Sequence, residues 1–171
     1  AIRWEYRVHE QVLPAVLRQG GTIRPTDVAF HHGGYHDPAL RRRKLERNLR
    51  LLRMQDAEHP GDPFTLFNLG ALLLDFGQAA EALPFLQRGL ERAPPHHALL
   101  PRMYGLLTHT HRLLGQGQQA WTRCREGRSR FPHDGELLYH EGLLAHEQGD
   151  HAVALACLTR LLEVPPGAAY G

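Results

Sequence analysis

Apolar residues recur at helical spacing along the second half of the chain. Leu69 and Leu73 lie four residues apart, and Leu83, Leu86 and Leu90 follow one another at intervals of three and four. This spacing places each set on one face of an α-helix, where it can be buried against a neighbouring helix. The pattern predicts paired amphipathic helices.

The region from residue 63 onward repeats itself. Segments 63–96, 101–134 and 135–168 have equal length and align without internal gaps, with an insertion, 97–100, between the first two. Three equivalent positions are identical in all segments: glycine at Gly77, Gly115 and Gly149, alanine at Ala82, Ala120 and Ala154, and proline at Pro94, Pro132 and Pro166. A further position holds Gly70 and Gly142 in the outer segments and Thr108 in the middle one.

Each repeated residue type has a structural reason. A glycine after the first helix of a segment can take the left-handed backbone that ends a helix. Small residues, such as Gly70 and Ala82, let two antiparallel helices approach closely. The proline ends the second helix and fixes the turn into the next segment.

These positions resemble the tetratricopeptide repeat (TPR), and the resemblance covers residues 63–168. It implies a mainly α fold: a three-repeat TPR α-solenoid of antiparallel helix pairs, preceded here by a short α/β remnant and a connecting helix. Such solenoids have a concave groove that binds peptides or partner proteins in many family members. A rigid spacer or a dimerisation surface is the alternative interpretation.

The variant of the repeat that clamps a C-terminal carboxylate uses Lys and Asn at fixed positions of the first helices. The corresponding residues here include Phe67, Ala71, Leu106 and His140, which argues against that variant. Residues 165–171 (PPGAAYG) contain no polar capping helix, although terminal repeats normally need one. We expect that the parent protein continues or that another molecule covers this end, for example in a homo-oligomer.

The first sixty residues follow a different pattern. Residues 2–8 alternate between apolar and polar, which predicts a half-buried β-strand with Trp4 in the core. A short helix over 10–19, a second extended segment over 27–32 and a long helix from Asp37-Pro38 to about Glu58 are predicted after it. Residues 1–37 are therefore interpreted as the C-terminal edge of an α/β domain, residues 38–60 as a connecting helix, and residues 63–168 as the repeats.

An ordered set of motifs in this region resembles one group of bacterial family-2 glycosyltransferases. The set consists of Arg7-Val8-His9-Glu10, Phe30-His31-His32-Gly33-Gly34-Tyr35, Lys44-x-x-Arg47-Asn48 and Asp62-Pro63. In that group a nucleotide-sugar-binding catalytic domain of GT-A type ends in such motifs, and TPR repeats follow it. The resemblance implies a parent protein that transfers a sugar from a nucleotide-sugar donor to an acceptor, with Mg²⁺ or Mn²⁺ as cofactor.

The resemblance carries four candidate site residues. Glu10 is at the position of the carboxylate that activates the acceptor hydroxyl as general base. His32 is at the position of a late histidine that helps to hold the metal and the diphosphate. Lys44 and Arg47 belong to the K-x-x-R-N motif and are candidates for phosphate contacts. The basic run around them is alternatively a solvated helix face.

The chain departs from that group in one decisive respect. Such enzymes hold the metal with an early D-x-D pair, because hard cations prefer carboxylate oxygens, and this chain contains no D-x-D. The chain by itself is therefore expected to be catalytically incompetent and to need no cofactor. A free-standing TPR adaptor, and a small metalloenzyme that uses His31, His32 and His36, are the other interpretations.

Composition narrows the class of protein further. The chain is 42% hydrophobic and 22% charged, and its net charge of +2 is too small to indicate nucleic acid as a partner. No apolar run approaches the length of a transmembrane segment, and no signal peptide is recognised, so a cytoplasmic location is expected. Cys124 and Cys157 match no metal spacing and are expected to be reduced core thiols. His109 and His111 are expected at the surface.

Overall fold

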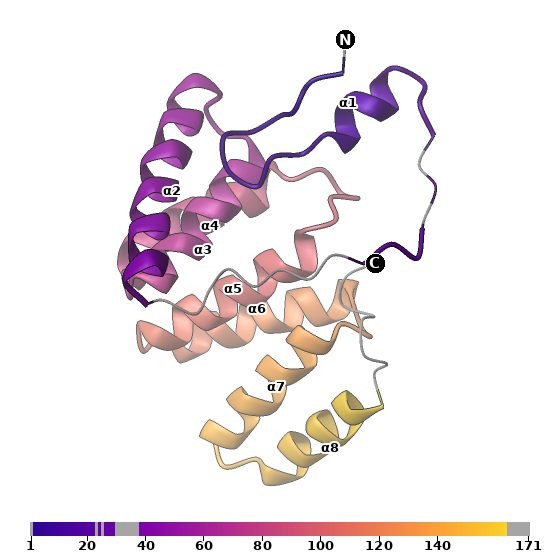
Figure 1. Cartoon of the computed structure of the whole chain (residues 1–171). Helices are drawn as coiled ribbons and strands as arrows, with labels where there is room; N and C mark the ends of the chain where they lie inside the picture. The colour runs from indigo at the N-terminus through magenta and orange to yellow at the C-terminus, as the bar shows by residue number, and fades with distance from the viewer. Residues whose placement is uncertain (1, 23, 25, 30–37, 164–171) are drawn as a thin grey trace. The chain divides into compact units, whose positions relative to one another are not determined.

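The computed structural model describes residues 2–22, 24, 26–29 and 38–163. It divides into two compact units, Ala1–Pro60 and Gly61–Gly171. In the described ranges the regular structure is entirely helical (Figure 1). The prediction of a mainly α protein is confirmed.

Three antiparallel helix pairs form the described part of the second unit (Figure 1). The pairs are α3 (Pro63–Asp75) with α4 (Ala79–Arg92), α5 (Leu100–Leu113) with α6 (Gly117–Arg130), and α7 (Gly135–Glu147) with α8 (His151–Leu162). Each pair packs on the next through α4 against α5 and α6 against α7, and the first helices also contact one another. The result is the solenoid that the repeat predicts.

The core of this unit includes leucines that the helical spacing singles out. Leu69, Leu73 and Leu86 are fully buried in the first pair, as is Leu66, whereas Leu83 and Leu90 are half-buried. Between pairs, Phe67 packs with Leu100 and Met103, together with the half-buried Leu90. Burying a leucine or phenylalanine side chain is worth about 1.5–3 kcal/mol, so these contacts supply the cohesion of the stack.

Small residues lie where the paired helices approach most closely. A Cβ atom at Gly70 would lie 2.4 Å from side-chain atoms of Leu86. Ala82 and Ala120 are fully buried and Ala154 nearly so. Gly77, Gly115 and Gly149 follow the first helices with φ of +72°, +69° and +80°, the left-handed region in which a side chain is strained. Pro94 and Pro132 each lie just beyond the end of a second helix, and Pro166 lies outside the described residues.

Aspartates cap the starts of three helices. The Asp62 carboxylate accepts a hydrogen bond from the Thr65 backbone N–H at 2.8 Å, and Asp134 accepts one from Leu137 at 2.9 Å. Asp150 does the same for Val153 at 3.1 Å. These bonds satisfy backbone donors that have no partner inside the helix.

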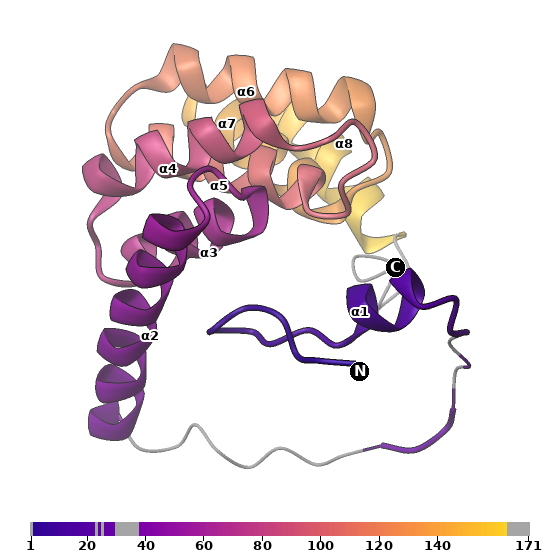
Figure 2. The same ribbon diagram turned by 90° about the horizontal axis from the view of Figure 1, so that it is seen from above.

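The first unit contains α1 (Leu13–Arg18) and the long helix α2 (Pro38–Glu58), both visible in Figure 2. α2 is close to its predicted extent, and Leu52 is buried while Leu45 and Leu49 are half-buried. α1 is shorter than the predicted helix over 10–19. An ion pair of 2.6 Å joins Arg7 to Glu58 at the end of α2.

The prediction of a β-strand over residues 2–8 is wrong. Tyr6 and His9 have φ of +68° and +56°, which turns the chain back so that Glu5 and Gln11 form only an isolated antiparallel bridge. Without a sheet there is no face to bury the alternating residues, and Trp4 is 69% exposed, contrary to the core position expected for it. Residues 27–29 have no regular structure, and the rest of the predicted segment 27–32 lies outside the described residues.

None of the helices in the described ranges combines the length and hydropathy that crossing a bilayer requires.

Candidate functional site

The first helices of the three pairs share one face of the solenoid. α5 packs directly on α7, and α3 also contacts α5. We call the side chains that meet across these helices the A-helix strip: Phe67 from α3; Arg102, Gly105, His109 and Arg112 from α5; and Glu136, Tyr139, His140 and Glu147 from α7.

The two ends of the strip are tied by charged side chains. At one end the Arg102 guanidinium lies over the Phe67 ring, 5.6 Å from its centroid. At the other end Arg112 donates two hydrogen bonds to the Glu147 carboxylate, at 2.9 and 2.8 Å. Such a two-pronged pair fixes geometry as well as adding attraction. The carboxylate of Glu147 is thus satisfied within the protein.

The middle of the strip is a cluster of aromatic and imidazole rings. The His140 ring lies 6.1 Å from that of His109 and 5.7 Å from that of Tyr139, centroid to centroid. Tyr139 is 45% exposed. The strip therefore presents an accessible aromatic surface with imidazole groups beside it.

His140 is buried and electrically neutral. Its side chain is 8% exposed, and its Nδ1 has no hydrogen-bond partner in the described part of the chain. Burial, with smaller contributions from the neighbouring His109 and Arg112, lowers the pKa of His140 to about 4. Burial also lowers the pKa of His109. At neutral pH both imidazoles are uncharged.

Glu136 places a half-buried carboxylate beside this cluster. A Cβ atom at Gly105 would lie 2.8 Å from Glu136 Oε1, so glycine leaves the room that the carboxylate occupies against α5. Burial raises the pKa of Glu136, while the Arg102 charge opposes that rise and Asp134 adds to it. The His140 Nε2 atom lies 4.0 Å away, beyond hydrogen-bond distance.

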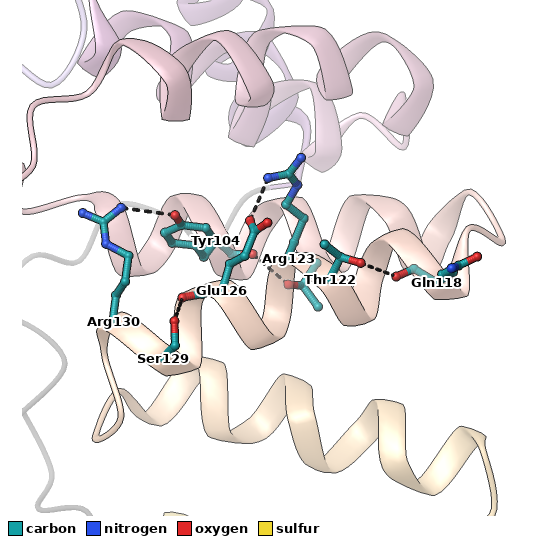
Figure 3. A network of polar contacts seen from close by, with 8 residues as sticks. Tyr104, Gln118, Thr122, Arg123, Glu126, Ser129 and Arg130 are labelled. Atoms are coloured by element: carbon teal, nitrogen blue, oxygen red, sulfur yellow. Dashed lines mark hydrogen bonds and ion pairs between the residues drawn. The ribbon is translucent and has the colours of Figure 1, made fainter.

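A second group of polar contacts lies on α6 and reaches α5 at Tyr104 (Figure 3). Arg130 Nη1 donates to the Tyr104 hydroxyl at 3.2 Å, and Arg123 pairs with Glu126 at 2.7 Å. The hydroxyl groups of Thr122 and Ser129 donate to backbone carbonyls one turn earlier, those of Gln118 and Glu126. Of these contacts, the one between Arg130 and Tyr104 joins α6 to α5, and the other three lie within α6.

The residues singled out by the glycosyltransferase resemblance lie in the first unit. Glu10 is exposed in the segment before α1. Lys44 and Arg47 lie in the first half of α2, where Arg47 donates to the neighbouring Asn48 side chain at 2.9 Å. His32 lies outside the described residues, as do His31 and His36. Their roles stay predictions.

Potential metal ligands and cysteine thiols are two further kinds of chemical group in the described ranges. These ranges hold no group of three His, Cys, Asp or Glu side chains that could bind a metal ion. Cys124 and Cys157 are buried and unpaired with each other, as expected. Burial raises the pKa of Cys124 to about 12 and also raises that of Cys157, so both are protonated thiols at neutral pH.

The expectation of a surface position for His111 is wrong. Its side chain is 4% exposed, and Nδ1 lies 2.7 Å from Gln116 Oε1. In the repeat, His111 is equivalent to the buried Leu73 and Ala145, a correspondence that would have predicted its burial. His109 is half-buried in the strip.

Sequence reasoning also missed the strip itself. It compared Phe67 and His140 with a known clamp but left out Arg102, Gly105 and Glu136. The signal is nevertheless in the repeat: Arg102 and Glu136 are equivalent residues of consecutive repeats, and so are Gly105 and Tyr139. Residues that share a face of one first helix share it in the next.

This chain is similar in sequence to a known TPR repeat-containing protein. A TPR repeat-containing protein of Synechococcus elongatus is 28% identical over 176 residues and covers 99% of this chain. The chain spans 35% of that relative's length. The chain matches no family model.

Solved structures share the fold at low identity. MamA is 18% identical with a TM-score of 0.63, over 79% of this chain and 78% of that one. YrrB, a TPR protein with an unusual peptide-binding site, is 16% identical with a TM-score of 0.62, over 75% of this chain and 64% of that one. A chain of the APC/C hetero-tetramer Cut9–Hcn1 is 18% identical with a TM-score of 0.65, over 73% of this chain and 23% of that one.

The fold is that of a TPR solenoid, and the sequence is similar to that of a TPR repeat-containing protein. None of the relatives named here is described as a glycosyltransferase.

Proposed function

We propose that the chain is a protein-interaction module that holds a peptide segment of a partner protein on the A-helix strip. The observation that carries this proposal is the exposed Tyr139 ring beside the buried His140, whose Nδ1 atom lacks a hydrogen-bond partner in the described residues, and beside the half-buried carboxylate of Glu136. A buried polar atom without a hydrogen-bond partner destabilises the free protein. A ligand that supplies the missing partner removes this penalty, and its binding free energy becomes more favourable.

The resemblance to YrrB adds to the proposal, since that TPR protein has a peptide-binding site. Aromatic side chains with a few polar groups between them are typical of surfaces that hold peptides.

A selection of displayed random dodecapeptides against the chain tests this function. Enriched peptides should bind the wild type and lose most of their affinity for Tyr139→Ala. Trp4→Ala, which removes another exposed aromatic ring from the first unit, serves as the matched control and should bind normally. Failure to enrich any peptide, or equal loss in both variants, would count against the proposal.

A second candidate concerns the parent protein. We propose that the chain is the C-terminal part of a family-2 glycosyltransferase, because the motifs around Glu10, His32 and Lys44-x-x-Arg47-Asn48 are spaced as in that group. The share of the Synechococcus relative that the chain spans leaves room for a further domain in a protein of that kind. In such a parent Glu10 would be the general base, and His32 would help to hold Mg²⁺ or Mn²⁺ beside the nucleotide-sugar.

Donor hydrolysis by the full-length parent tests this second candidate. Activity with a nucleotide-sugar that falls on Glu10→Gln and on His32→Ala, but not on Glu91→Gln in α4, would support it. A start codon close to Ile2 in the gene would sink it and leave the free-standing adaptor.

We also propose that the chain associates with itself through α8. Leu155, Leu158 and Leu162 are 68%, 39% and 88% exposed and lie on one face of that helix. The equivalent positions in α4 and α6 include Leu86 and Cys124, which are fully buried. An apolar face of this kind is a favourable surface for association.

A further inference from the structure

The side chain of Glu136 is 37% exposed, and its carboxylate accepts no hydrogen bond from the side chains of the strip. Its Oε1 atom lies 4.0 Å from Nε2 of His140, which can form an ion pair with it only when the imidazole is protonated. Within the part of the chain that the structure describes, no donor hydrogen-bonds to this carboxylate. Glu147, on the same helix, differs in this respect because Arg112 satisfies it.

No cationic side chain of the described residues forms an ion pair with Glu136 at neutral pH; burial and the Asp134 charge raise its pKa, and the Arg102 charge opposes that rise. His140 stays uncharged at neutral pH because of its burial. Asp134, which caps α7 through the Leu137 N–H, adds a second negative charge nearby. Glu136 is in the first turn of α7, where the helix dipole stabilises a carboxylate. Arg102 is close enough to influence it electrostatically but forms no ion pair with it, and its guanidinium lies over Phe67.

An exposed aromatic ring for a ligand side chain to pack on is present beside the carboxylate. The Glu136 carboxylate lies against Gly105 of α5, where a side chain would meet it. Tyr139, three residues after Glu136 on α7, lies on the same helix face and is exposed. Its ring can pack against the methylene groups of a long basic side chain, and the face of a tyrosine ring also attracts a cation.

We propose that Glu136 is the receptor for a lysine or arginine side chain of the bound peptide, whose cationic group pairs with the carboxylate while its stem packs on Tyr139. This inference rests on the proposed peptide-binding function and specifies the chemistry of the partner. It differs from recognition of a C-terminal carboxylate, for which the strip would need cationic groups at this point.

The test uses one arginine-containing peptide from the display selection and its citrulline analogue, which is neutral and nearly identical in shape. Affinities are measured by fluorescence polarisation for the wild type, Glu136→Gln, Gly105→Ala and the control Glu91→Gln. Hydrogen bonds between charged groups are stronger than those of a neutral donor, so the wild type should prefer arginine by about tenfold or more. Glu136→Gln should bind both peptides equally, and Glu91→Gln should retain the preference.

Gly105→Ala provides an independent variant that keeps all charges. Its Cβ atom would displace the Glu136 carboxylate, so the preference for arginine should shrink. If Glu136→Gln keeps the preference, or if the enriched peptides carry no basic residue, the inference is overturned while peptide binding stands. If no peptide is enriched at all, the proposed function fails together with it.

Discussion

At the scale of single residues, the glycines of the first helices determine how closely each pair packs. Gly70 and Gly142 are equivalent in the repeat, but their surroundings differ. A Cβ atom at Gly70 would lie 2.4 Å from Leu86 side-chain atoms, whereas one at Gly142 would lie 3.3 Å from Leu158 and 3.4 Å from Cys157. Leu86 is fully buried and has little room to move.

Gly70→Ala should therefore lower the free energy of unfolding by about 1–2 kcal/mol, the cost of overpacking reduced by the better helix propensity of alanine. Gly142→Ala should be neutral or stabilising by up to about 1 kcal/mol, because there the propensity term dominates. Urea denaturation of the two variants measures the difference. Equal effects would show that the two helix pairs are packed alike.

The buried imidazole of His140 predicts a pH dependence of stability. Its pKa is about 4 in the folded protein and about 6.5 when unfolded, so below pH 6.5 the unfolded chain binds a proton that the folded chain does not. The contribution of the neutral His140 to the free energy of unfolding is therefore fully present above pH 6.5, and it is lost as the pH falls from 6.5 towards 4. Between pH 7 and pH 5 the loss from this group should be about 2 kcal/mol.

Urea denaturation at both pH values, with the wild type and His140→Leu, isolates this contribution. The variant should lose about 2 kcal/mol less than the wild type over the same range. A pH dependence identical to that of the wild type would mean that His140 is protonated as readily in the folded state as in the unfolded one.

At the scale of elements, helix starts depend on aspartate caps that the sequence makes visible. Asp62 accepts from both the backbone N–H and the hydroxyl of Thr65, at 2.8 and 2.7 Å. Asp62→Ala should lower the free energy of unfolding by about 1 kcal/mol, whereas Asp62→Asn, which keeps an acceptor, should lower it by only a few tenths. Thermal denaturation of the pair checks this, and equal losses would point to charge instead of capping.

The sequence predicted the helices of the repeats correctly, but its prediction of a strand over residues 2–8 is wrong. The helix pairs follow from local spacing, repeated glycines and prolines, so α3 to α8 could be read directly. A strand needs a partner to bury its alternating face, and alternation over residues 2–8 does not reveal whether one exists. The left-handed backbone at Tyr6 and His9 removes the strand, and a tyrosine gives no sequence signal of such a conformation.

The candidate site was less predictable than the fold. The strip depends on which side chains of α5 and α7 face one another, and the pairing of Gly105 with Glu136 or of His109 with His140 is a property of packing. Aligning the repeats identifies the face, but the burial that keeps His140 neutral and leaves Glu136 unpaired becomes evident only in three dimensions.

At the scale of the whole molecule, the exposed face of α8 predicts concentration-dependent self-association. Replacing Leu155 and Leu162 together with Gln should shift the chain towards monomer in sedimentation velocity experiments, because the apolar area that drives association is lost. Leu113→Gln, an exposed leucine on α5, is the control and should leave the distribution unchanged. A wild type that stays monomeric at all concentrations contradicts the proposed self-association.

The central claim, that the A-helix strip holds a peptide, is tested most directly by mapping a selected peptide onto the protein. Backbone amide spectra recorded during titration should show the largest shift changes in α5 between Arg102 and Arg112 and in α7 between Glu136 and Glu147. Amides of α4, α6 and α8 should change little, and Tyr139→Ala should abolish the pattern. Changes concentrated on the second helices, or in the first unit, would contradict the account.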